Sequence, residues 1–249
     1  VQNHFENFSL DLLFALPKQN LAQLEWEIEE FLSFQPPHVS AYCLTVPDKH
    51  PMNQDRASES DQVIMFDRVL NRFAEKGMDR YELSNFCRPG FQSQHNNLYW
   101  TDQNYWGVGL SAHSYRKSPD FGFRFWNPKT YEAYIQQIEN LEANPEVHLS
   151  FPAGQWEKLQ PHEALTDYCH TRLRLATGVD LRSVRQKFGE QAVVVVAGKL
   201  QKPIEHGLVL QKGEQLCLSD RGFVLSNQVF ESLLISPADI DRSLTKPIF

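Results

Sequence analysis

The chain has 249 residues, of which 41% are hydrophobic and 12% aromatic, and its formal net charge is −7. This composition supplies the core of one large domain or two ordinary ones and excludes an intrinsically disordered chain. No window has the ~18 uncharged apolar residues of a membrane span, and the N-terminus lacks the regions of a signal peptide. We therefore expect a folded, cytoplasmic protein, and the acidic balance argues against non-specific binding of nucleic acid.

The four cysteines are dispersed along the chain, at positions 43, 87, 169 and 217. No two of them form a CxxC or CxxxC pair. This pattern is typical of reduced, buried thiols, and it predicts neither a disulfide framework nor a metal site built from neighbouring cysteines.

The first third of the chain alternates between strand and helix patterns. It predicts a strand over 8–16, a helix over 20–34, a strand over 38–46, a helix over 59–77 with Gly77 as its cap, and a strand over 81–86. This rhythm is typical of βαβ units with a parallel sheet. Because parallel sheets are normally covered on both faces, these elements make only half of an α/β domain. Ligands are expected at the carboxyl ends of the strands.

The segment 87–127 is rich in Gly, Asn, Ser and aromatic residues and has no clear helical or strand period, so we interpret it as a long, ordered, functional loop. A helix is predicted over 128–141 and a linker over 142–154. The predicted domains are therefore residues 1–141 and 155–236.

The second domain is predicted to be mostly helical. Its pattern predicts two helical pieces over 155–178 divided near Pro161, a helix over 179–189, a helix or strand over 191–207, a hairpin over 208–219 and a final helix over 220–234. The order of helix, helix, hairpin and helix resembles a winged-helix module.

Asp11 stands in the middle of the first predicted strand, where an unpaired buried carboxylate would be costly. The strand period places it with Ser9, on the face opposite Leu12 and Phe14. Two interpretations follow: an internal salt bridge or cap, or an acceptor for a polar ligand.

The string "HNNLYW" at 95–100 also allows two interpretations. In a turn, Asn96 and Asn97 supply the backbone conformations and the aromatic residues pack. In a helix, His95 and Tyr99 share one face at a spacing of four residues. A neutral imidazole beside flat aromatic surface suits a macrocycle with a metal, such as heme.

Two further features are weaker. His113 follows the glycines of "GVGLSAHS" and is either a packed loop residue or a ligand contact.

Residues 171–202 hold seven Arg and Lys against two acids, which on a winged-helix-like module favours either a DNA-facing surface or a solvated helix face.

Six motifs in order resemble the oxygen-independent coproporphyrinogen III oxidase-like group of radical S-adenosylmethionine (SAM) proteins, and especially its heme-chaperone branch. They are "DLLFALPKQ", "HVSAYCLT", "YELSNFCRPG", "HNNLYW", "YWGVGLSAHS" and "LRLATGVDL", and together they cover nearly the whole chain.

The resemblance implies an α/β fold: the second half of a partial (β/α)6 barrel, followed by a smaller, mostly helical C-terminal domain. It implies that Asp11 contacts SAM and that Thr45 and His113 face the cofactor region. It also implies a heme site with His95 as candidate iron ligand, formed by His95, Asn96, Tyr99 and Trp100.

Two departures from the family pattern are present. The CxxxCxxC motif that holds a [4Fe–4S] cluster is absent, so the chain should perform no radical chemistry alone. Ala15 stands where the family usually has Gly, which predicts an ordinary backbone there, because Ala at positive φ costs about 1 kcal/mol.

The sequence therefore predicts a heme-binding, heme-transfer protein whose partners are heme or a porphyrin and acceptor proteins. An oxygen-independent coproporphyrinogen III oxidase is the first alternative, and a winged-helix DNA-binding protein is the second.

Overall fold

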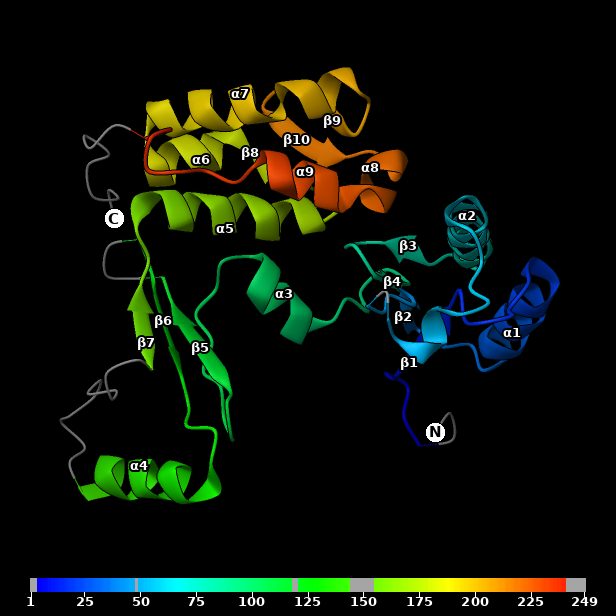
Figure 1. The fold of residues 1–249 in the computed structure, drawn as a ribbon, viewed down its shortest axis with the longest axis horizontal. Coiled ribbons are helices and arrows are strands. Elements are labelled where there is room, and N and C mark those ends of the chain that lie inside the picture. Colours follow the sequence, from blue (N-terminus) through cyan, green and yellow to red (C-terminus); the bar gives the residue numbers. More distant parts are fainter. Residues whose placement is uncertain (1–3, 48, 118–120, 144–154, 241–249) are drawn as a thin grey trace. The chain divides into compact units, whose positions relative to one another are not determined.

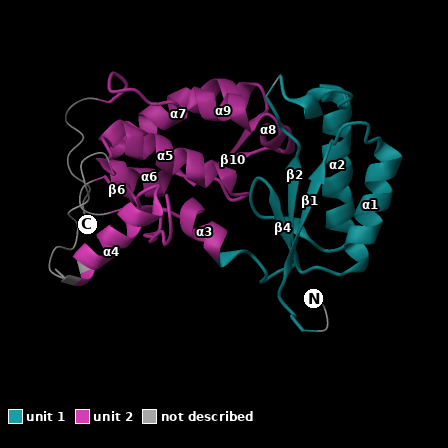
Figure 2. Ribbon diagram, turned by 60° about the horizontal axis from the view of Figure 1, so that its bottom comes forward, with its two compact units in different colours: residues 1–94 teal, residues 95–249 magenta. Residues whose placement is uncertain are grey.

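The computed structural model describes residues 4–47, 49–117, 121–143 and 155–240. These residues form two compact units, residues 1–94 and 95–249 (Figure 2). No helix among the described residues has the length and apolar character needed to cross a membrane.

The first unit is one sheet with two helices packed on one face. The sheet has the order β1-β2-β4-β3, and its one parallel pair, β1 and β2, is joined by the first helix. The elements are β1 (Ser9–Phe14), α1 (Leu21–Ser33), β2 (His38–Cys43), the short 3-10 helix η1 (Pro51–Asn53), α2 (Glu59–Glu75), β3 (Asp79–Arg80) and β4 (Asn85–Cys87), all labelled in Figure 1 except η1.

The core of this unit lies between the sheet and both helices, as the apolar spacing predicts. Leu12 and Phe14 of β1 pack with Leu24 of α1 and with Val69 and Phe73 of α2. Burial of this apolar surface fixes the helices on one face and leaves the alternate side chains of β1 on the other. The predicted order from the first strand to the second helix is confirmed.

The predicted third parallel strand is wrong. The chain passes through β3, turns, and returns as β4, which lies antiparallel to both β2 and β3. The turn forms because the Glu82 carboxylate accepts hydrogen bonds from the backbone N–H of Ser84 (3.0 Å) and from the Asn85 side chain. An internal carboxylate thus stabilises a tight turn inside a run that reads as one strand.

Ala15 also departs from prediction. Its φ is +58° and it is fully buried. The left-handed conformation, which costs a non-glycine residue about 1 kcal/mol, is held by the turn in which the Leu16 N–H donates to Gln19 Oε1 at 3.1 Å. Gly77, by contrast, ends α2 at φ +70° as predicted.

The second unit contains two three-stranded sheets, with the orders β5-β6-β7 and β8-β10-β9. Its elements are α3 (Gln94–Trp100), β5 (His113–Arg116), β6 (Phe123–Trp126), α4 (Tyr131–Ala143), β7 (Trp156–Lys158), α5 (Pro161–Arg174), β8 (Val179–Asp180), α6 (Leu181–Phe188), α7 (Glu190–Glu205), β9 (Val209–Lys212), β10 (Gln215–Leu218), α8 (Asp220–Val224) and α9 (Ser226–Ser232) (Figure 1).

Regular structure occupies parts of the segment that the sequence presents as a long loop. The string "HNNLYW" is helical, which selects one of its two interpretations, and β5 and β6 form an antiparallel pair after it. The helix predicted before Pro161 is wrong: Trp156 to Lys158 are strand β7, paired with β6. Cross-strand contact between Trp156 and Phe123, with ring centroids 5.5 Å apart, favours this pairing.

The C-terminal part agrees better with prediction. The "VVVV" run is helical, with Val193 and Val196 buried on one side and Val194 exposed. The hairpin is confirmed, with Gly213 at φ +64°, and the predicted final helix is divided into α8 and α9.

The predicted linker lies largely outside the described residues. The boundary between the compact units falls after residue 94, so the predicted first domain (1–141) extends across both units. The predicted second domain (155–236) lies within the second unit, and its strand β7 pairs with β6 of the predicted first domain.

Candidate functional site

Helix α3 presents the His and Tyr of its motif on one side. Their spacing of four residues brings the Tyr99 hydroxyl to 3.1 Å from His95 Nε2, and the two rings meet edge to face at 5.1 Å. The His95 side chain is exposed. An imidazole that is accessible to a ligand and oriented by a neighbouring hydroxyl has the arrangement that metal-binding histidines commonly show.

Aromatic rings continue from α3 into the strand that follows it. Tyr99 meets Tyr105 edge to face at 4.6 Å, and Tyr105 lies 6.1 Å from Tyr115 of β5. The guanidinium of Arg174, on α5, covers Trp100 at 4.4 Å from its ring centre. Tyr99 and Trp100 are both half-buried, so the predicted stacking surface is partly used by contacts within the protein.

Beside α3 lies a pocket of about 250 Å³. Residues from α3, the strands β5 and β6, and α5 contribute to its lining, which consists of Tyr99, Trp100, Asp102, Tyr105, Tyr115, Arg124, Leu159, Ala164, Asp167, Tyr168 and Thr171. Two motif residues, Tyr99 and Trp100, therefore form part of its wall. The His and the Asn of the motif, His95 and Asn96, do not line it.

The charged groups of this pocket are paired. Asp102 accepts a hydrogen bond from the Tyr115 hydroxyl at 2.8 Å and forms an ion pair with Lys187. Burial is the largest cause that raises the pKa of Tyr115 above its usual range, and the nearby Asp102 carboxylate is the second. The phenol therefore remains a neutral donor.

Arg124 connects two carboxylates at the pocket. Its Nη1 donates to Glu157 at 3.1 Å, and its Nη2 donates to Asp167. Burial raises the pKa of Asp167, an effect that Arg124 opposes. The positive charge of the Arg124 guanidinium is thus already neutralised by the acidic side chains of this wall.

His113 lies elsewhere in the same unit. It is exposed on β5, stacks on Trp126 at 5.6 Å, and is not among the residues that line the pocket. The preceding glycines have a packing role: a Cβ on Gly107 would approach the His113 carbonyl oxygen to 2.3 Å. The Asn127 side chain donates to the carbonyls of Gly107 and Gly109, at 3.0 and 2.9 Å, and so fixes this loop.

Asp11 and Thr45 lie in the first unit. Asp11 is exposed on the sheet face opposite the helices, beside Ser40 in the register of β2, as the strand period predicts. Thr45 is exposed just after β2, where its hydroxyl donates to the Cys43 carbonyl at 3.3 Å. The site residues are therefore divided between the units, with His95, Asn96, Tyr99, Trp100 and His113 in the second.

The open face of the first sheet also carries polar residues that sequence reasoning missed. His38 is buried and hydrogen-bonded to Ser9 Oγ at 2.7 Å and to the Tyr81 hydroxyl at 2.8 Å. Asn85 is buried, and among the described residues its Oδ1 has no hydrogen-bond partner. The acid and amide in "YELSN" are the sequence signal that could have indicated this cluster, because such residues are rarely buried without a purpose.

No group of three or more His, Cys, Asp or Glu side chains in the described part of the chain is arranged to hold a metal ion. Cys87 and Cys169 are buried, and Cys43 and Cys217 are partly exposed. Burial raises the pKa of Cys169 to about 12, which keeps its thiol protonated. The described cysteines thus do not fit a cluster site.

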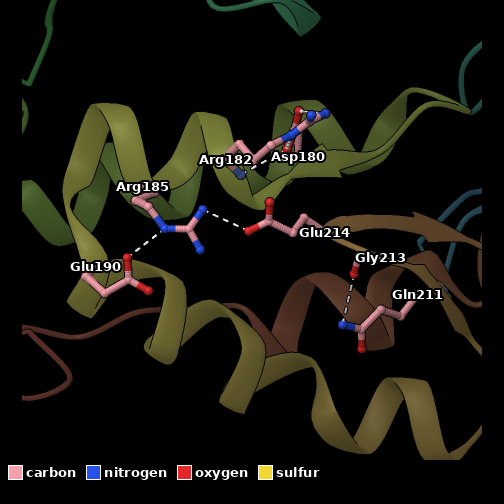
Figure 3. A network of polar contacts seen from close by, with 7 residues as sticks. All are labelled: Asp180, Arg182, Arg185, Glu190, Gln211, Gly213 and Glu214. Carbon is pink, nitrogen blue, oxygen red and sulfur yellow. Dashed lines mark hydrogen bonds and ion pairs between the residues drawn. The ribbon is translucent and has the colours of Figure 1, made fainter.

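The basic stretch is largely neutralised within the protein. Arg182 pairs with Asp180 at 2.9 Å, and Arg185 bridges Glu190 and Glu214, at 2.6 and 2.8 Å (Figure 3). Elsewhere in the stretch, Lys187 pairs with Asp102, and Lys199 with Asp239 at 3.0 Å. Three of these acids, Glu214, Asp102 and Asp239, lie outside the stretch, so its local positive charge is smaller than the sequence indicates.

Comparisons with known proteins identify relatives over most of the chain. Residues 159–225 match the family model described as HemN C-terminal domain. The heme chaperone HemW of Lactococcus lactis is 30% identical over 238 residues, and that of Bacillus subtilis 30% identical over 237 residues. These alignments cover 93% and 92% of this chain and 59% of each relative, so the chain spans about three-fifths of their length.

The fold has a solved counterpart, described as coproporphyrinogen III oxidase (HemN) from Escherichia coli, a radical SAM enzyme. The TM-score is 0.65 at 16% identity, over 93% of this chain and 57% of that one. At this identity the match supports the α/β fold alone. The resemblance to the coproporphyrinogen III oxidase-like radical SAM family, and within it to the HemW heme chaperones, is therefore confirmed over most of the chain.

Proposed function

We propose that this chain binds heme and takes part in its transfer, as part of a heme chaperone of the HemW type. The observation that carries the proposal is the pair formed by His95 and Tyr99 on α3, next to an aromatic pocket. The names of the relatives support the same ligand. In this proposal His95 is the iron ligand or anchor, and Asn96, Tyr99 and Trp100 complete the heme site.

The first unit is proposed to be part of a (β/α)6 barrel and to contact SAM. Asp11 supplies a carboxylate on the sheet face opposite the helices, and Thr45 supplies a hydroxyl near the carboxyl end of β2. Among the described residues, Oδ1 of Asn85 has no hydrogen-bond partner, which suits a hydrogen-bonding ligand at this sheet. His113 is a further proposed contact. SAM and a [4Fe–4S] cluster belong to the complete family member, in which the cluster would supply electrons for reductive chemistry.

Residues 155–236 are proposed to form the winged-helix-like C-terminal domain of this protein. Acceptor proteins for heme and a cytoplasmic location complete the proposal. A second candidate function is that of an oxygen-independent coproporphyrinogen III oxidase, which is favoured by the match of residues 159–225 to the HemN C-terminal domain model.

Titration with hemin tests the heme site directly. The absorbance of the Soret band is followed for the wild type and for His95→Ala. Loss of an axial ligand is expected to shift the band and to weaken binding by about tenfold or more. His206→Ala is the matched control, because this exposed histidine of the same unit does not line the pocket. Identical spectra and affinities for wild type and His95→Ala would remove His95 from the site.

A further inference from the structure

The pocket beside α3 is too small for a whole porphyrin. Its volume is about 250 Å³, whereas sites that enclose a complete drug-sized ligand measure about 300–1,000 Å³. A cavity of about 150 Å³ already takes a benzene molecule. The pocket therefore has room for one edge of a macrocycle, a single pyrrole ring with its substituents.

The wall of the pocket is mainly aromatic and apolar. Four tyrosines and Trp100 contribute rings, and Leu159 and Ala164 contribute aliphatic surface. Rings of this kind favour a flat, apolar group, which they contact edge to face or by offset stacking. Because Tyr99 and Trp100 belong to both the wall and the motif, a macrocycle held at His95 would have this pocket within its reach.

The charges at the pocket disfavour an entering carboxylate. Its lining, as far as the structure describes it, includes the two carboxylates of Asp102 and Asp167 and one guanidinium, that of Arg124. Both terminal nitrogens of Arg124 already donate to acids, and Lys187 beside the pocket is paired with Asp102. Arg172 and Arg174 lie over the rings of Tyr168 and Trp100, at 5.4 and 4.4 Å, and Arg172 also donates to the Thr101 carbonyl oxygen at 3.2 Å. A third carboxylate would lose its hydration and meet two like charges, while the cations nearest the pocket are already held by acids, a backbone carbonyl or aromatic rings.

We propose that this pocket admits an apolar pyrrole edge and rejects one that carries a propionate, so that the site selects heme over iron coproporphyrin. Heme has two neighbouring pyrrole rings that bear only methyl and vinyl groups. Coproporphyrin III has a propionate on every pyrrole ring. This inference rests on the proposed function, and it names the feature of the ligand that the site recognises. It also separates the two candidate functions, since the oxidase must accept a substrate with propionates at every edge.

The test compares three iron porphyrins on the full chain by titration at the Soret band. Hemin and iron mesoporphyrin IX, in which ethyl groups replace the vinyl groups, are expected to bind with similar affinity. Iron coproporphyrin III is expected to bind more weakly by about tenfold or more, since a poorly compensated buried carboxylate costs at least that much. Equal affinity for hemin and iron coproporphyrin III would overturn the inference and leave the heme proposal standing.

Charge variants assign the selectivity to the pocket. Asp167→Asn removes one carboxylate and frees part of Arg124, so the preference for hemin should narrow several-fold. Asp102→Asn tests the second carboxylate independently. Glu132→Gln, an exposed residue of α4 outside the pocket lining, makes the same change in net charge and should leave the preference unchanged. An unchanged preference in both Asp variants would overturn the inference. The proposed function has its own separate test: it is refuted if the wild type does not bind hemin, or if the wild type and His95→Ala bind hemin equally well.

Discussion

The hydrogen bond between His95 and Tyr99 bears on which ring nitrogen can reach iron. Tyr99 occupies Nε2 at 3.1 Å, which leaves Nδ1 accessible on an exposed ring. Histidines that ligate metals commonly donate their other N–H to a neighbouring acceptor, which orients the ring and raises its basicity. Tyr99 is thus a positioning residue for His95 in the proposed site, in addition to lining the pocket.

Removing the hydroxyl should weaken the iron bond and leave the aromatic wall intact. Tyr99→Phe is expected to lower hemin affinity by about tenfold and to shift the reduction potential of the bound iron, because the imidazole loses its partner. The measurement is a hemin titration together with spectroelectrochemistry.

Tyr131→Phe is the matched control for this variant, because this exposed tyrosine of α4 does not line the pocket. The control should bind and titrate like the wild type. An unchanged reduction potential in Tyr99→Phe would contradict the positioning role.

Individual residues also show where prediction from sequence ends. The spacing of His95 and Tyr99 predicts their contact, provided that the segment is helical, and the structure meets that condition. Ala15 could not be predicted in the same way: its left-handed backbone is imposed by the following turn, which a residue's own preference does not reveal.

At the scale of elements, His38 links two strands and a turn. It is hydrogen-bonded to Ser9 of β1 and, through its other ring nitrogen, to Tyr81, whose hydroxyl also accepts from the Ser93 N–H at 3.2 Å. Burial lowers the pKa of His38 below its usual value of 6.5, and Asp11 opposes this effect. The neutral imidazole is therefore the form that the folded sheet favours.

This lowered pKa predicts that the first unit becomes less stable in acid. The unfolded chain takes up a proton at His38 at higher pH than the folded chain does, so the stability that His38 provides is complete above about pH 6.5 and is lost as pH falls toward and through the folded pKa. Hydrogen exchange of the β1 and β2 amides, converted to opening free energies, should reveal the loss between about pH 8 and pH 5.5.

His38→Gln should flatten this pH dependence. The control is His170→Gln in α5, whose histidine also has a pKa lowered by burial but belongs to the second unit, where its Nε2 lies 2.9 Å from the Phe230 carbonyl oxygen. Its effect on β1 and β2 should be nil. Equal pH slopes in wild type and His38→Gln would refute the assignment.

Periodicity predicts elements where one face is buried against a regular partner. The elements α1, α2, α6 and the hairpin β9–β10 follow from apolar spacing and turn glycines, whereas the run of valines in α7 leaves helix and strand open. The short strands β3, β4 and β7 do not, because two or three residues are too few for a period and their pairing depends on distant partners such as Phe123.

At the scale of the whole molecule, charge argues against a nucleic-acid partner. The net charge is −7, and Arg182 and Arg185 of the basic stretch are engaged with acids (Figure 3). A phosphate contact would have to displace a carboxylate that is already paired. The predicted winged-helix-like module alone therefore does not favour DNA binding.

We expect no gel shift with duplex DNA at about 0.15 M salt, because the acidic chain has few uncommitted cations in its basic stretch. The double variant Glu190→Gln and Glu214→Gln, which releases Arg185, measures how much those acids suppress residual binding at low salt. A gel shift of the wild type that weakens steeply with rising salt, and that is absent in the double variant Arg182→Ala and Arg185→Ala, would support the DNA-binding alternative.

The sheet order β1-β2-β4-β3 leaves β1 at an edge, with one side paired to β2 and no strand on its other side among the described residues. Six residues of extended backbone there present unpaired N–H and C=O groups, together with the apolar side chain of Leu13. Such an edge is a template to which another strand can add. The same edge is also a site for self-association in solution. Concentrated preparations of this chain should therefore assemble through β1 unless a strand from another source pairs with the β1 edge.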